Sequence, residues 1–124
     1  MDSSKDKGDL GEQAAVEYLI KNGYSILQRN FRTRYGEIDI IGRDEDYIAF
    51  IEVKTRKNNE FGLPCEAVTK NKQNKIIRMA MMYISQKRLY GLNFRFDVVE
   101  TIISNDEIRY LRLIKNAFDA DSII

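Results

Sequence analysis

The chain has 124 residues and a formal net charge of +1, from 20 Lys and Arg against 19 Asp and Glu. With 44% hydrophobic and 31% charged residues it is typical of a globular chain, and its length suits a single domain over residues 1–124. The absence of histidine excludes Ser-His-Asp and Cys-His hydrolases and histidine zinc sites. A lone cysteine, Cys65, a polar N-terminus and short apolar stretches predict a cytoplasmic protein without disulfide, signal peptide or membrane span.

The first half of the chain predicts a helix followed by three strands. Residues 9–22 have the spacing of an amphipathic helix, with Leu10, Ala14 and Tyr18 on its apolar face, Ala15 and Leu19 beside them, and Asp9 as the N-cap. Residues 24–29 predict a short strand. Residues 36–43 and 48–55 alternate as two more strands, joined by a loop over residues 44–47.

The second half predicts a loop over residues 56–64, a helix and two strands. The helix spans residues 70–90 and ends at Gly91; we expect its apolar face to be Ile76, Ile77, Ala80, Met81 and Ile84. Strands follow at residues 94–102 and 108–115, with a turn at 104–106. The order α-β-β-β-α-β-β predicts an α/β fold, a mixed β-sheet flanked by helices.

The central hairpin brings carboxylates together. If Arg43 lies opposite Ile48, then Asp39 lies opposite Glu52 and Glu37 lies opposite Lys54, all on one face. Two adjacent carboxylates need a cation or a shared proton, and their hard oxygens suit Mg²⁺ or Mn²⁺.

Lys54 follows Glu52 by two residues, about 7 Å along the strand. Its ammonium group there can orient an attacking water and stabilise charge on a phosphoryl oxygen. The hairpin therefore predicts metal-dependent hydrolysis of a phosphodiester.

Each of these groups also has a plainer interpretation. A Glu-x-Lys strand face is often only solvated, and Asp39 could lie on the solvent side of an antiparallel sheet. Glu12 fits either a capping box with Asp9 or a supporting role at a metal site.

The positive charges are clustered rather than spread evenly, which favours nucleic acid as a partner despite the low net charge. We expect the basic residues near the hairpin to hold the phosphate backbone of DNA, namely Arg32, Arg34, Arg56, Lys57, Lys70 and Lys72.

These residues resemble a known pattern. The spacing of Asp39, Glu52, Val53 and Lys54 resembles the PD-(D/E)xK nuclease superfamily, although Ile38 stands where the proline of that motif would be. Glu12 resembles the additional acid of the archaeal Holliday junction resolvases. The chain is most similar to the bacterial YraN family of endonuclease-like proteins, through the segments 11–15, 23–24, 29–32, 36–41, 50–56, 61–62, 95–99 and 116–118.

The resemblance implies a restriction-endonuclease-like core. It also implies that Asp39, Glu52 and the Val53 carbonyl bind Mg²⁺ or Mn²⁺, that Lys54 orients water, and that Glu12 supports the site. We expect a DNA endonuclease, with branched recombination or repair DNA as a candidate substrate and a homodimer or a repair partner completing it. The alternatives are a non-catalytic nucleic-acid-binding module on a nuclease scaffold, and a partner subunit of a larger complex.

Overall fold

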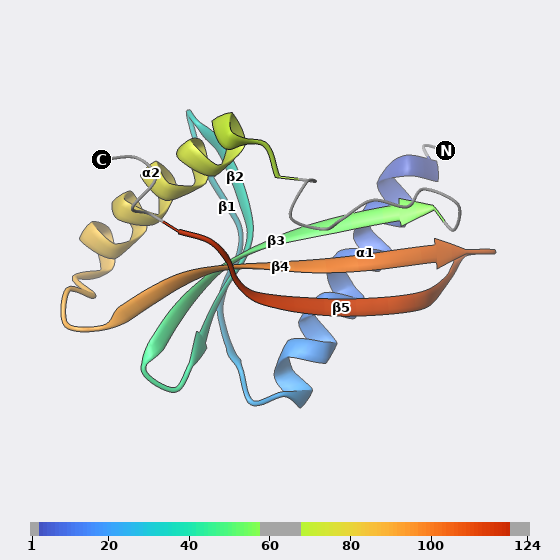
Figure 1. The fold of residues 1–124 in the computed structure, drawn as a ribbon, viewed down its shortest axis with the longest axis horizontal. Helices are drawn as coiled ribbons and strands as arrows, with labels where there is room; N and C mark the ends of the chain where they lie inside the picture. The colour runs from blue at the N-terminus through green and yellow to red at the C-terminus, as the bar shows by residue number, and fades with distance from the viewer. Residues whose placement is uncertain (1–2, 58–67, 120–124) are drawn as a thin grey trace.

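The structure is a computed structural model that describes residues 3–57 and 68–119 of the chain. Its elements are α1 (Ser3–Lys21), β1 (Ser25–Thr33), β2 (Gly36–Asp44), β3 (Tyr47–Lys57), α2 (Lys70–Lys87), β4 (Asn93–Ser104) and β5 (Glu107–Phe118). The strands form one sheet in the order β1-β2-β3-β4-β5 (Figure 1). Only β3 and β4 run parallel; the other neighbours are antiparallel. The predicted α/β class, element order and mixed sheet are confirmed.

The two helices cover opposite faces of this sheet (Figure 1). On one face α1 packs on Ala49 and Ile51, which alternate along β3 with residues of the other face. On that other face α2 packs on Ile48 and Phe50. Helix α2 also covers the end of the sheet where β1 and β2 curl away from the other strands. The sheet is therefore the middle of three layers, and side chains on both faces of its inner strands β2, β3 and β4 are buried.

Helix α1 differs from its prediction in both start and orientation. It begins at Ser3, so Asp9 lies inside the helix, and the predicted capping box between Asp9 and Glu12 is wrong. The face toward the sheet contains Gly11 and the predicted Ala15 and Leu19. Leu10 and Ala14 are only half-buried and Tyr18 is exposed, so the helix is rotated away from its predicted main stripe. A Cβ on Gly11 would lie 2.1 Å from Thr55 Oγ1. The small residue at position 11 thus determines which face of the helix approaches β3. The spacing of hydrophobic residues in the sequence does not predict this.

Helix α2 lies close to its predicted place. Thr69 is the N-cap, and its hydroxyl accepts a hydrogen bond from the Lys72 backbone N–H at 3.2 Å. The helix ends at Arg88, which takes the left-handed conformation (φ 55°), rather than at Gly91. Met81 is 44% exposed, so its predicted place in the core is wrong. Met79 and Tyr83 are buried instead, because the helix also packs against the curled hairpin.

The β2–β3 hairpin has the predicted register. Arg43 pairs with Ile48 and Ile41 pairs with Phe50. The turn is shorter than predicted, since Asp44 and Tyr47 are still paired and only Glu45 and Asp46 form it.

The segment predicted as a loop begins later than expected, because Arg56 and Lys57 belong to β3. The rest of that segment, and Cys65, fall within residues 58–67, outside the described part of the chain. Neither α1 nor α2, the helices of the described residues, is long and apolar enough to cross a membrane.

Candidate active site

Asp39 lies where β2 separates from β3. The ladder between the two strands reaches Ile40 and Ile51, one residue short of Asp39 and Glu52. Ile38 packs with α2 and Ile40 packs with α1, although residues two apart on a strand normally share a face. The strand therefore twists at Asp39. Its Oδ2 accepts a hydrogen bond from the Val53 backbone N–H at 2.8 Å, which ties the carboxylate to β3.

Glu52 carries the second carboxylate and lies between two lysines. Its Oε1 accepts a short hydrogen bond from Lys72 Nζ of α2 and lies 3.9 Å from Lys54 Nζ. The side chain is only 6% exposed. Its other oxygen, Oε2, is buried and has no hydrogen-bond partner among residues 3–57 and 68–119. A buried carboxylate oxygen without a donor costs free energy unless a further cation or water reaches it.

The charges of this cluster shift the pKa values of its members. Burial and then the charge of Glu52 raise the pKa of Asp39 to about 7, against the lowering effect of the Val53 N–H. Burial and the nearby Lys72 lower the pKa of Lys54. Burial also opposes the charged form of Lys72, but its hydrogen bond to Glu52 and the charge of Glu52 raise its pKa overall. The two lysines are therefore unequal: Lys72 holds its proton more firmly than Lys54.

A cavity of about 300 Å³ opens beside Asp39, lined by Gly8, Asp9, Glu12, Asp39, Val53 and Thr55. Glu12 enters it from α1. Its Oε1 accepts a hydrogen bond from Arg29 at 3.3 Å and, when the Asn30 amide nitrogen faces it, another from Asn30 at 3.2 Å. Glu12 thus lines the cavity and is also tied to β1. The charges of Glu52 on β3 and of Glu12 on α1 both raise the pKa of Asp39.

The donors at this place fit a hard divalent cation. No cluster of three or more His, Cys, Asp and Glu side chains that could hold a metal ion occurs in the described ranges. The two carboxylates and the Val53 carbonyl would give three protein oxygens, which suits Mg²⁺ because it keeps several waters. The buried Oε2 of Glu52 has no donor among the described residues, and burial together with the charge of Glu52 raises the pKa of Asp39; a bound cation would relieve both.

The other predicted residues fall into three groups. Lys72, predicted from the sequence to hold the DNA backbone, contacts Glu52 within the cluster. The predicted Glu37–Lys54 contact is not formed, because Glu37 pairs with Arg32 at 3.1 Å. The remaining basic residues lie at the Arg34–Tyr35 turn, the end of β3 and the start of α2, namely Arg34, Arg56, Lys57 and Lys70.

No pattern in the sequence predicts the contact between Lys72 and Glu52. It lies on a helix, 20 positions after Glu52. No spacing rule within one strand or one helix relates the two residues, and only the packing of α2 on β3 brings them together.

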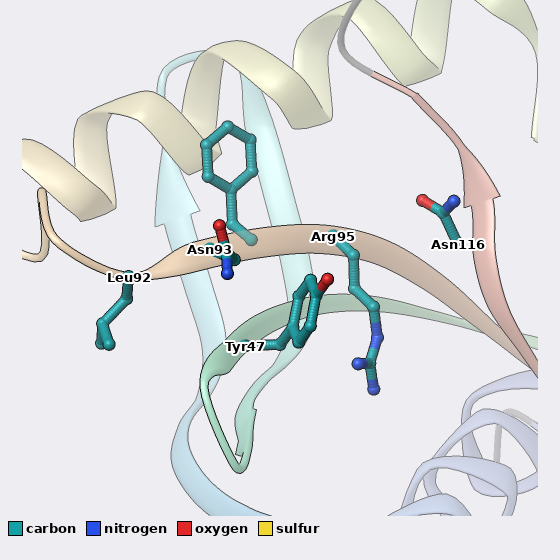
Figure 2. A pocket seen from close by; sticks show the side chains of 6 residues that line it. Tyr47, Leu92, Asn93, Arg95 and Asn116 are labelled. Carbon is teal, nitrogen blue, oxygen red and sulfur yellow. The ribbon is translucent and has the colours of Figure 1, made fainter.

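A second cavity, of about 560 Å³, lies at the other end of the sheet and is lined by Tyr47, Leu92, Asn93, Phe94, Arg95 and Asn116 (Figure 2). Figure 2 shows Arg95 from β4 beside the ring of Tyr47, and the Arg95 guanidinium lies 5.1 Å from the centroid of that ring. Tyr47 is seven residues from Lys54 along β3, or about 23 Å.

Sequence analysis did not single out the ion pairs of Arg95. Its Nε donates to Asp97 Oδ2 at 3.1 Å, and its Nη2 donates to Asp44 at 2.8 Å and to Tyr24 OH at 2.6 Å. Asp97 is fully buried and also accepts a hydrogen bond from the Asn116 backbone N–H at 2.8 Å. Buried charges with this many partners hold the start of β4 to the rest of the sheet, which is a structural task.

The fold and the site together define a small α/β protein in which two carboxylates and two lysines lie where strands β2 and β3 separate. The chain belongs to the family described as Uncharacterised protein family UPF0102, whose model matches residues 11–101. That range includes Glu12, Asp39, Glu52, Lys54 and Lys72. This is the family that the sequence resembles under the name YraN, so the resemblance to the YraN family is confirmed.

Similar proteins occur in several clostridia. A UPF0102 protein of Clostridium acetobutylicum is 53% identical over 116 residues, which cover 93% of this chain and 95% of the relative. UPF0102 proteins of Clostridium tetani and Clostridium kluyveri are 53% and 50% identical over the same length, with the same coverage. The likeness extends over nearly the whole of each chain.

Proposed function

We propose that this protein is a metal-dependent endonuclease that hydrolyses phosphodiester bonds in DNA. The observation that carries the proposal is the convergence of Asp39, Lys54 and Lys72, from β2, β3 and α2, near the carboxylate of Glu52. The lysines contact Oε1 of that carboxylate, while its buried Oε2 has no donor among the described residues. A fold alone does not imply an activity, so the proposal rests on this site. Membership of the PD-(D/E)xK superfamily is part of the proposal.

The chain's own residues have separable tasks in this reaction. Asp39, Glu52 and the Val53 carbonyl would hold Mg²⁺ or Mn²⁺, which when bound supplies Lewis-acid stabilisation of charge on the phosphate. Lys54 orients the attacking water, and its ammonium group stabilises charge that develops on the phosphate. Lys72 keeps its charge and attracts the phosphate. The water oxygen bonds to phosphorus as the bridging P–O bond breaks, and the leaving oxygen takes up a proton.

The proposed substrate and assembly follow from the charge and the size of the domain. Basic residues border the site on β3 and α2, which fits a DNA backbone. A domain of this size contacts few base pairs, so a homodimer or a repair or recombination partner would supply a second site for branched DNA.

One observation favours a non-catalytic nucleic-acid-binding module instead. Lys72 and Lys54 already neutralise Oε1 of Glu52 without any metal. If these two ammonium groups are the only cations that Glu52 needs, the cluster is a structural ion-pair network that binds DNA without cutting it.

Cleavage assays distinguish the two. Labelled duplex, single-stranded and four-way-junction DNA are incubated with Mg²⁺ or Mn²⁺ and with the wild type, Asp39→Ala or Lys54→Ala. The matched control is Asp46→Ala, which removes an exposed acid at the far end of the same hairpin. We expect the wild type and the control to cleave DNA. The cleavage rate should be at least about a hundredfold lower in Asp39→Ala and in Lys54→Ala.

Calorimetric titration with Mn²⁺ gives a readout independent of turnover. We expect binding to the wild type and to Asp46→Ala, and none to Asp39→Asn or Glu52→Gln. DNA binding without metal binding or cleavage would overturn the nuclease proposal and favour the binding module.

A further inference from the structure

The turn between β1 and β2 carries a tyrosine that two guanidinium groups approach. Arg34 Nη2 donates a hydrogen bond to Tyr35 OH at 2.9 Å, and Arg34 Cζ lies 5.0 Å from the centre of the Tyr35 ring. Arg78 Cζ, from α2, lies 6.0 Å from the same centre. Both arginines are exposed, while Tyr35 is half-buried against the core. Two like charges from different elements thus converge on one ring.

These two charges have no counter-ion in the described part of the chain. The ion pairs found among residues 3–57 and 68–119 involve neither Arg34 nor Arg78. The hydrogen bond and the charge of Arg34 lower the pKa of Tyr35, and Arg78 adds to that effect. Guanidinium groups are well matched to phosphate, so an unneutralised pair of them attracts a phosphate anion.

A row of basic residues on α2 leads from the candidate active site to this turn. Lys72, Lys75 and Arg78 follow one another at three-residue spacing, so their side chains are neighbours along the helix surface. Helix α2 contains neither Asp nor Glu. Lysines in a first turn are unfavourable beside the positive end of the helix dipole, so their placement weakens the helix while it favours an anionic partner. From Lys72 to Arg78 the helix rises about 9 Å.

The turn is held in place against α2. The Tyr35 backbone N–H donates a hydrogen bond to Thr33 Oγ1 at 3.0 Å. Gly36 has a φ of 136°, which favours glycine, and a Cβ there would lie 3.8 Å from Met79 Cε of α2. The turn and the helix therefore present one preorganised surface.

On the basis of the proposed function, we propose that Arg34, Tyr35, Lys75 and Arg78 form a phosphate track for one strand of the nucleic-acid substrate. The track would contact the backbone about two to three nucleotides from the bond that is cut, since a strand advances about 3.4 Å per nucleotide along the duplex axis. Its contacts go to phosphates and therefore position the strand without reading its sequence.

The test is the salt dependence of DNA affinity without divalent ions. Affinity for a fluorescein-labelled DNA duplex is measured in EDTA over a series of salt concentrations. The variants are Arg34→Ala, Arg78→Ala, the double variant and Tyr35→Phe. The matched control is Lys87→Ala, which removes a basic residue from the last turn of the same helix.

We expect each arginine variant to lower the slope of log affinity against log salt by about 1, and the double variant by about 2. Tyr35→Phe keeps the ring but frees Arg34, so we expect a smaller loss of affinity. Lys87→Ala should match the wild type. Arginine variants with the wild-type slope, or a wild type that does not bind DNA, would overturn the track.

The two proposals fail in different ways. If the arginine variants have a reduced slope but the wild type does not cleave DNA, the phosphate track is supported and the nuclease proposal is refuted. If the wild type cleaves DNA but the arginine variants have the wild-type slope, the nuclease proposal is supported and the phosphate track is refuted.

Discussion

Asp39 Oδ2 accepts a hydrogen bond from the Val53 backbone N–H at 2.8 Å, just beyond the end of the β2–β3 ladder. The side chain of one strand thus replaces a missing ladder bond of the other. The same contact fixes a carboxylate near Glu52, and Asp39 and Val53 both line the adjoining cavity. The separation of β2 from β3 at this point thus explains two features, namely the hydrogen bond between Asp39 and Val53 and the position of the candidate metal site.

The first prediction concerns the pH dependence of stability. The pKa of Asp39 is about 7 in the folded chain, because of burial and the charge of Glu52, and near 3.9 when unfolded. Between these values the folded state holds the extra proton, so the free energy of unfolding falls as pH rises from about 4 to about 7. In EDTA we expect a lower Tm at pH 8 than at pH 5. Asp39→Asn should reduce this difference, and Mn²⁺ should restore the Tm of the wild type at pH 8.

Thermal unfolding followed by circular dichroism provides the measurement. The same Tm difference in Asp39→Asn and in the wild type would contradict the assignment of the effect to Asp39. Asp46→Asn, at the exposed turn of the hairpin, should behave as the wild type.

The second prediction concerns competition between Lys72 and a divalent ion. Lys72 Nζ donates to Glu52 Oε1, so Lys72→Met should free that oxygen and raise the affinity for Mn²⁺. We expect an increase of no more than about fivefold, since a partly exposed ion pair contributes up to about 1 kcal/mol. DNA affinity should fall in the same variant. Calorimetry measures both, with Lys70→Met as the control; weaker Mn²⁺ binding in Lys72→Met would show that Lys72 supports the site instead.

The third prediction concerns the close approach of α1 to the sheet. A Cβ on Gly11 would lie 2.1 Å from Thr55 Oγ1 and 2.9 Å from Thr101 Oγ1, so Gly11→Ala should destabilise the fold by about 1–3 kcal/mol. Gly8→Ala is the matched control, because no atom lies within 4 Å of that Cβ, and it should stabilise by up to about 1 kcal/mol. Urea unfolding measures both changes.

A double variant checks the cause. Thr55→Ala removes the hydroxyl that the new methyl group would meet, so Gly11→Ala should cost less in that background. Equal losses in both backgrounds would show that the clash is not the reason.

The fourth prediction concerns the buried ion pair at the start of β4. Asp97 is fully buried and pairs with Arg95 at 3.1 Å, so Asp97→Ala leaves Arg95 with Asp44 as its remaining counter-ion and removes the acceptor of the Asn116 backbone N–H. We expect a loss of about 3–5 kcal/mol in urea unfolding. Asp44→Ala removes a more exposed partner of the same arginine and should cost about 1 kcal/mol or less. Equal losses for the two would refute the role given to burial.

Much of the fold could be predicted from the sequence, because periodicity and turn residues are local. The element order and the β2–β3 register follow from alternation along residues 36–55 and from the acidic turn. That register alone brought Asp39 near Glu52 and Lys54 in the sequence analysis.

The errors came where packing overrode hydrophobicity. The buried face of α1 follows Gly11 and Ala15, because small side chains let the helix approach β3. The buried face of α2 includes Met79 and Tyr83 rather than Met81, because the curled hairpin covers that side.

The sequence by itself determined the α/β order, the family and the β2–β3 register that brings Asp39 toward the strand of Glu52 and Lys54, since these depend on neighbours along the chain or across one short turn. Only the tertiary structure decided that Lys72 contacts Glu52 and that Arg78 joins Arg34 at Tyr35. Those contacts depend on how α2 lies on the sheet. The position of a helix on a sheet is set by the shapes of both packed surfaces, which no local pattern in the sequence encodes.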